Sequence, residues 1–304
     1  MKKHIKLALK IIVSGVAIYY VVSKLDFQLI ITVIKSAKIW LMSVALFFYV
    51  LSLLFAAERL NFLFRKIDLK LSFFENIKLY WLGIFYNLFL PGGVGGDGYK
   101  IYFIDKYLNI KIKKSLGAIL SDRISGLTVV FIFLLFFSYS ILNKLIFQHS
   151  IWILMPSIKL LFQHSIWILI PFSIICFWVL LRYINFSFSN AFFPVFGLAF
   201  IVQFLQMATA IVILTALNVY MLGDFNDYLF LFFLSAVMGS IPITLGGLGI
   251  RELTFLIGAQ QLGIDQNIAV SLSLLFYAVS VITALPGIFY SIKPEKIYKN
   301  FRTP

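Results

Sequence analysis

The chain has 304 residues, of which 62% are hydrophobic and only 12% are charged, and its mean hydropathy is +0.99. Soluble domains keep roughly a quarter of their residues charged, so this composition excludes an ordinary water-soluble domain. The net charge of +14 does not indicate nucleic-acid binding, because most lysines and arginines flank apolar runs in four short clusters, at 2–10, 59–70, 100–114 and 293–302. This distribution is the positive-inside pattern of a membrane protein and favours anionic membrane lipids as partners.

The apolar runs are near the roughly 18–20 residues that an α-helix needs to cross about 30 Å of hydrocarbon. They predict six spanning helices, at about 7–23, 39–57, 115–142, 160–182, 191–217 and 267–290. No A-x-A-type cleavage site ends the first run, so we interpret it as an uncleaved helix. An amphipathic stretch at 26–38 is typical of a helix in the membrane interface. Lipid-exposed backbone must satisfy its own hydrogen bonds, which predicts an all-α polytopic bundle in one transmembrane domain, residues 1–304.

The positive-inside rule also predicts the orientation. Basic clusters at both ends place both termini in the cytoplasm, which requires an even number of crossings. The clusters at 59–70 and 100–114 are both cytoplasmic only if 72–97 enters and leaves on the same side. The turn at 224–227 has no Lys or Arg and fits the outside, so that 228–258 dips in from the outer face. We therefore expect six full crossings and two re-entrant elements; the alternative is eight crossings, with one basic cluster outside.

A duplicated segment follows the predicted span 115–142 and runs into the predicted span 160–182. Residues 147–156 recur as 162–171 with one substitution. A single near-identical copy is typical of a tandem duplication and not of a solenoid, which needs three or more repeats. His149 and His164 are therefore copies of one residue and do not indicate a metal site, and the chain has a single cysteine. We expect no metal and no cofactor.

Two glycine-rich interruptions follow prolines, Pro91 and Pro242. At membrane depth, irregular backbone is tolerated only where protein or a water-filled cavity covers it, and amides freed before a helix suit an anion such as phosphate. Two similar breaks in the two halves match the inverted repeats of transporters, whereas either break alone resembles an ordinary turn at the headgroup level. The candidate substrate-binding residues are Gly92, Gly93, Gly95, Gly96, Asp97 and Lys100 in the first break, and Gly246, Gly247, Gly249, Arg251 and Glu252 in the second.

A third polar feature places Asp122 and Arg123 inside the predicted span 115–142. Ionisable residues there are costly unless they are paired or face a cavity. Either Arg123 binds a lipid phosphate while Asp122 holds its geometry or couples to protons, or Arg123 reaches back to the cytoplasmic headgroups. Four other charged residues are expected near the membrane surface: Glu58, Arg59, Glu75 and Lys78.

Three motifs carry a family resemblance: Leu-Pro-Gly-Gly-x-Gly-Gly-Asp near residue 90, Ser-Asp-Arg-Ile-Ser-Gly-Leu at 121–127, and Pro-Ile-Thr-Leu-Gly-Gly-Leu-Gly-Ile-Arg-Glu at 242–252. Over about residues 7–290 the chain resembles the lysylphosphatidylglycerol synthase transmembrane family, a flippase-like family of bacteria and archaea. Glu252 stands at the acidic position of the third and most specific motif. In the first motif, Lys100 stands where the family often has Arg, and Lys is not equivalent to Arg at a phosphate site.

The resemblance implies movement of aminoacylated or other phosphate-bearing lipids between the leaflets of a prokaryotic plasma membrane. It implies a stand-alone member, since we expect no soluble aminoacyltransferase domain after the last span. The leading hypothesis is a lipid translocase or lipid-binding protein, and not an enzyme. One alternative is an integral-membrane enzyme acting on lipid-linked substrates, with Asp97, Asp122 or Glu252 as acid or base. Another is an assembly partner of a lipid-modifying enzyme, and a homo-oligomer is compatible with all of these.

Overall fold

The computed structural model describes residues 27–89, 95–148, 156–219, 224–241 and 249–292. Every regular element within these ranges is a helix, which confirms the all-α prediction. Several predictions fall outside the described residues: those on the first helix at 7–23 and on Gly92, Gly93, His149, Gly246 and Gly247.

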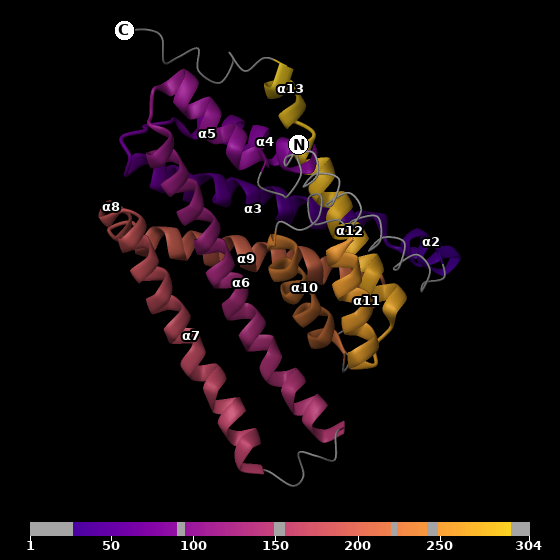
Figure 1. Cartoon of the computed structure of the whole chain (residues 1–304). Coiled ribbons are helices and arrows are strands. Elements are labelled where there is room, and N and C mark those ends of the chain that lie inside the picture. The colour runs from indigo at the N-terminus through magenta and orange to yellow at the C-terminus, as the bar shows by residue number, and fades with distance from the viewer. Residues whose placement is uncertain (1–26, 90–94, 149–155, 220–223, 242–248, 293–304) are drawn as a thin grey trace, which may run out of the picture.

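Among the described residues, five helices are long and apolar enough to cross a membrane. They are α3 (Ile39–Arg65), α6 (Ile112–Gln148), α7 (Pro156–Ile184), α9 (Phe192–Ala216) and α12 (Gln266–Ala284), and they match the second to sixth predicted spans. The amphipathic stretch forms α2 (Phe27–Ser36), and the short α8 (Phe186–Ser189) joins α7 to α9. The 37 residues of α6 extend about 55 Å at 1.5 Å per residue, more than a bilayer core requires. Figure 1 shows α6 and α7 projecting together beyond the other helices.

Each glycine-rich break lies between two short helices that pack against one another. The first joins α4 (Phe73–Phe89) to α5 (Gly95–Leu108), and the second joins α10 (Phe225–Ser240) to α11 (Ile250–Leu262). In Figure 1 the first pair lies at the top and the second toward the bottom, on either side of α3 and α9. Helix pairs of this kind are the form that a re-entrant element takes, and the membrane face from which each enters remains a prediction.

The last predicted span is not one continuous helix. α12 ends at Ala284, and α13 (Gly287–Ile292) begins just after Pro286. Proline has no backbone N–H and clashes with the preceding turn, which explains the break. Gly287 lies so close to Trp81 and Phe85 of α4 that a Cβ at this position would collide with them. The predicted span 267–290 is therefore confirmed as far as Ala284, and beyond it the chain turns to pack on α4.

The centre of the bundle is formed by α3 and α9, which run antiparallel. The amide of Lys38 donates to the carbonyl of Ala216 at 3.3 Å at one end of the pair. Small buried residues on both helices, including Ala45, Ala57, Ala199 and Ala210, leave room for the backbones to approach. Association through small residues is typical of membrane helices, because lipid supplies no hydrophobic force between them.

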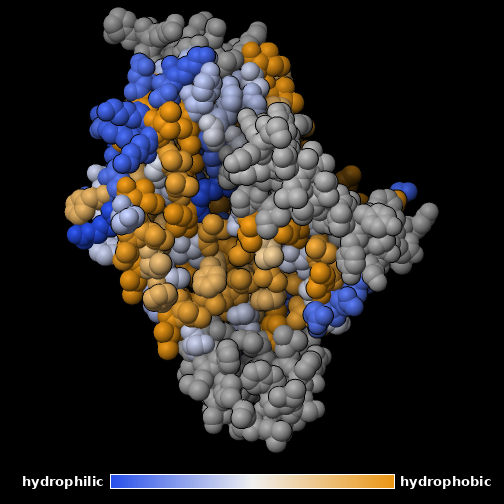
Figure 2. Space-filling model, in the orientation of Figure 1, coloured by the Kyte–Doolittle hydropathy of each residue, from blue (hydrophilic) through white to orange (hydrophobic). Residues whose placement is uncertain are grey.

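The outer surface is divided by polarity. Figure 2 shows a broad hydrophobic band across the middle of the molecule and hydrophilic side chains at the upper left, where Figure 1 places the end of α5 and the start of α6. Lys106, Lys111, Lys113 and Lys114 are exposed there. The face of α7 presents large apolar side chains, among them Ile168 and Phe172. An apolar surface of this extent belongs in lipid, since water would oppose its exposure.

Candidate functional site: an ionic cluster and a helix cap at the two breaks

Arg59 of α3 and Asp122 of α6 form a buried ion pair. Arg59 Nε donates to Asp122 Oδ1 at 2.7 Å, and the two side chains are 6% and 9% exposed. Arg59 is therefore paired inside the bundle, and its position at the membrane interface stays a prediction. Glu58 and Arg59 are neighbours on one helix and point in different directions, so that Glu58 pairs with the exposed Arg65 while Arg59 faces the core.

Small residues on α6 make room for the Arg59 guanidinium. A Cβ on Gly126 would lie 3.3 Å from Arg59 Nη1. Ser121 and Ser125 on the same helix are fully buried, and Ser125 turns its hydroxyl back to donate to the Asp122 carbonyl at 2.7 Å. Ser125 and Gly126 lie three and four positions after Asp122 and share a face with it. This stripe of small residues was the signal in the sequence that Asp122 receives a large partner from another helix.

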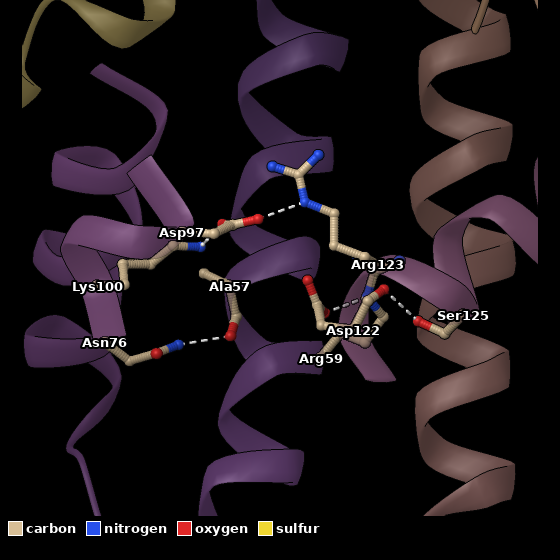
Figure 3. A network of polar contacts seen from close by, with 8 residues as sticks. All are labelled: Ala57, Arg59, Asn76, Asp97, Lys100, Asp122, Arg123 and Ser125. Atoms are coloured by element: carbon tan, nitrogen blue, oxygen red, sulfur yellow. Dashed lines mark hydrogen bonds and ion pairs between the residues drawn. The ribbon is translucent and has the colours of Figure 1, made fainter. Parts of the chain in front are cut away.

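Asp97, in the first turn of α5, holds two cations. Lys100 Nζ lies 2.8 Å from Asp97 Oδ1, and Arg123 Nε donates to Asp97 Oδ2 at 2.5 Å. Figure 3 shows the Arg123 side chain leaving α6 toward Asp97, with its terminal nitrogens directed away from that carboxylate. Asp97 is thus a carboxylate that binds Arg123, whereas Asp122 binds Arg59.

The glycines of the first break bring α4 and α5 into close contact. A Cβ on Gly83 would lie 2.6 Å from Lys100 Cε, so the absent side chain is what lets the lysine stem lie flat on α4. Lys100 Nζ also lies 5.1 Å from the centre of the Tyr80 ring, a cation–π contact. Gly96 packs directly against the carbonyl of Gly83, and its amide donates to Asn87 Oδ1 at 2.8 Å. The Gly96 amide is thus used within the protein and does not serve as an anion donor.

We call Arg59, Lys100, Arg123, Asp97 and Asp122 the ionic cluster (Figure 3). Its three cations and two carboxylates leave a formal surplus of one positive charge. Arg123 is the most open member, with a side chain 37% exposed, whereas the others are at most 10% exposed. Burying charged groups is costly, and the most exposed member of the cluster is a guanidinium. The arrangement suits an anionic group that approaches Arg123.

At the second break, Glu252 caps its own helix. Its Oε2 accepts from the Gly249 amide at 2.8 Å, and its Oε1 accepts from the Ser273 hydroxyl of α12 at 3.1 Å. Gly249 has a φ of +87°, which side chains other than glycine resist. Glu252 is 5% exposed. Both of its oxygens are therefore engaged in fixing the start of α11, which accounts for an acidic residue at this position of the motif.

Arg251 lies beside Glu252 but faces elsewhere. A Cβ on Gly239 of α10 would lie 2.7 Å from Arg251 Nε. Arg251 also lines a small cavity of about 30 Å³ with Gln206, Ser235 and Ser273. Its Nε is buried, and no residue in the described ranges accepts a hydrogen bond from it. A cavity of this size and polarity accommodates water.

The predicted site residues thus form two groups. The interactions of the first group connect α3, α5 and α6, and those of Glu252 connect α11 to α12. Glu75 is buried within the protein and caps α4 by accepting from the amide and hydroxyl of Ser72, and its position near the membrane surface stays a prediction. The described ranges contain no group of three or more His, Cys, Asp or Glu residues placed to hold a metal.

A helical bundle with several membrane-spanning helices and a charged cluster between them defines a multi-pass membrane protein. Within that class, the chain belongs to the family described as the lysylphosphatidylglycerol synthase TM region, whose sequence model matches residues 7–287. This confirms the resemblance carried by the three motifs. No curated protein matches the chain.

Proposed function

We propose that the protein moves phosphate-bearing or aminoacylated lipids between the two leaflets of a prokaryotic plasma membrane. The observation that carries the proposal is the ionic cluster, with three cations to two carboxylates and with Arg123 as its most exposed member. Ionisable residues inside a membrane bundle are costly and mark the paths of polar substrates. Membership of a family related to lipid modification and translocation supports the same class of substrate.

In the proposed mechanism, the lipid phosphate competes with Asp97 for Arg123. A planar guanidinium binds phosphate through two parallel hydrogen bonds. Lys100 keeps Asp97 compensated while Arg123 is engaged, because Lys100 binds the other oxygen of that carboxylate. The Arg59–Asp122 pair stays in place and holds α6 against α3. The headgroup crosses along this polar route, and the acyl chains remain in the surrounding lipid.

The carboxylates of the site give less support to an enzyme. Asp97 and Asp122 are bound to cations, and Glu252 to an amide and a hydroxyl. A general acid or base must reach the proton that it transfers, and these groups are committed to partners within the protein. We therefore favour binding and movement over chemical conversion.

Reconstitution into liposomes that contain a fluorescent phosphatidylglycerol tests this function. We expect the wild-type protein to equilibrate the lipid between leaflets, as measured by quenching of the outer-leaflet label. Arg123→Ala should slow this equilibration at least about tenfold, the factor for about 1.4 kcal/mol of lost phosphate binding. Arg65→Ala is the matched control, because it also removes an arginine from a carboxylate, but one at an exposed site.

Chemical turnover of the lipid without movement would overturn the proposal in favour of an enzyme. Equal slowing in both arginine variants would remove the ionic cluster from the mechanism. Movement that appears only after a second protein is added would favour an assembly partner.

The proposed orientation has both termini in the cytoplasm and the two breaks entering from opposite faces. It predicts that a cysteine replacing Asp105 of α5 reacts only from the inside and that one replacing Asn226 of α10 reacts from the outside. Both positions are exposed. Labelling of intact cells with a membrane-impermeant maleimide, after Cys176→Ser, measures this directly. External labelling at position 105 would instead favour eight full crossings.

A further inference from the structure

A pocket of about 170 Å³ lies between the projecting helices α6 and α7, close to the start of α10. We call it the α6–α7 pocket. Its lining includes Phe136, Tyr139 and Ser140 of α6, Trp167 and Ile170 of α7, and Asn226 of α10. The pocket lies apart from the ionic cluster, and the proposed translocation mechanism does not use it.

The shape and chemistry of the pocket suit hydrocarbon. Its walls are mainly aromatic and aliphatic, and the rings of Tyr139 and Trp167 meet edge to face at 6.2 Å. An engineered lysozyme cavity of about 150 Å³ with similar apolar walls stays dry and takes up benzene. The α6–α7 pocket therefore has room for a length of acyl chain and too little polar lining for a charged headgroup.

The surroundings of the pocket indicate which molecules meet it. Trp167 is 58% exposed, and its neighbours Ile168 and Phe172 are 68% and 63% exposed. In a membrane-spanning helix such side chains contact lipid, so the molecules at the mouth of the pocket are acyl chains. Ser140 and Asn226 add polar groups at its edge. Trp and Tyr prefer the boundary between hydrocarbon and headgroups, which places the pocket near the outer interface of the proposed topology.

We propose that the α6–α7 pocket holds an acyl-chain segment of one membrane phospholipid whose headgroup lies at the level of Asn226. Two of the lining residues, Trp167 and Ile170, come from the second copy of the duplicated segment. The duplication therefore has a structural consequence that the sequence alone did not reveal: it supplies one wall of a lipid site.

The test uses the full chain in vesicles that contain a phosphatidylcholine with a photoreactive diazirine in its acyl chain. After irradiation, peptide mapping by mass spectrometry locates the adducts. We expect them to concentrate on residues that line the pocket. Ser140→Leu fills the pocket and should lower this labelling about tenfold, the factor for roughly two methylene groups that lose their apolar contact. Ser173→Leu makes the same change on α7 away from the pocket and should leave the labelling unchanged.

Two results would overturn the proposal. One is labelling spread over α7 in proportion to exposure and unchanged in Ser140→Leu, which indicates ordinary surrounding lipid only. The other is an equal loss in Ser173→Leu. If Ser140→Leu does not fold, Ile170→Ala provides the second test: it enlarges the pocket, and adducts should persist and shift toward Phe137 deeper in the wall, whereas their disappearance contradicts the site. This labelling requires no lipid movement, so its outcome is independent of the translocation assay.

Discussion

The two glycine-rich breaks are built from the same types of residue, but the charged residues make different contacts. In both, a glycine on the first helix makes room for a long cationic side chain on the second: Gly83 for Lys100, and Gly239 for Arg251. In both, a carboxylate begins the second helix. At the first break Asp97 binds cations from α5 and α6. At the second break Glu252 binds its own helix start and Ser273.

This difference teaches that two motifs of similar sequence need not perform the same task. The carboxylate of Asp97 belongs to an ionic cluster that crosses between helices and ends at an exposed guanidinium. Both oxygens of the Glu252 carboxylate accept hydrogen bonds, one from the Gly249 amide and one from the Ser273 hydroxyl. The neighbouring cation, Arg251, lines a small cavity. We therefore expect ligand binding at the first break and structural rigidity at the second.

The largest effect should follow from breaking the buried pair of the first region. Asp122→Ala leaves the Arg59 guanidinium buried without its counter-ion, so the free energy of unfolding should fall by about 3–5 kcal/mol. Thermal unfolding in detergent measures the loss. The double variant Arg59→Met with Asp122→Leu should recover most of it, because an apolar pair of similar volume replaces the ions. A double variant no more stable than Asp122→Ala would contradict the view that the uncompensated charge of Arg59 causes the loss.

A smaller but sharp effect is expected from the close contact of α4 and α5. Gly96→Ala pushes a methyl group into the Gly83 carbonyl, which should cost about 3 kcal/mol, since backbone atoms cannot move aside as a flexible side chain can. Gly98→Ala lies two residues further along α5, and its new methyl group meets nothing within 4 Å. It should be neutral or stabilise the helix by up to about 1 kcal/mol. The same unfolding measurement compares the two, and equal costs would contradict the packing described here.

The smallest effect on stability should come from the second break. There, measuring stability and lipid movement together separates a structural role from a role in ligand binding. Glu252→Gln weakens the cap of α11 and should cost about 1–2 kcal/mol. In Glu252→Gln, the rate of lipid movement per folded molecule should stay near that of the wild type. In Asp97→Asn, this rate should change. The liposome assay, normalised to folded protein, makes the comparison. Loss of movement in Glu252→Gln without loss of stability would assign the second break a direct part in substrate binding.

Much of the fold followed from the sequence, because the membrane imposes its rules locally. Runs of about twenty apolar residues had to become helices, and α3, α6, α7, α9 and α12 match their predicted positions. Proline and glycine also predicted the two breaks, because each acts on the backbone at its own position. The exception was the last span, where Pro286 ends α12 sooner than the apolar run suggested.

The site was predicted in part. The sequence singled out Asp97, Lys100, Asp122 and Arg123 as residues, but not their partners. Arg59 was missed because it follows the end of the apolar run 39–57, where a charge fits the headgroup level, whereas α3 continues to Arg65. Glu252 was assigned to the substrate, although its carboxylate caps a helix.

The sequence by itself thus determined that the chain is a helical membrane protein and where its regular helices are interrupted, since both depend on short stretches of the chain and on the solvent around them. Only the tertiary structure decided which charge compensates which. Asp122 meets Arg59 across 63 positions, and Arg123 meets Asp97 across 26, because the packing of α6 against α3 and α5 brings those helix faces together. The direction in which each side chain leaves its helix set these pairs, and with them the partly exposed guanidinium of Arg123.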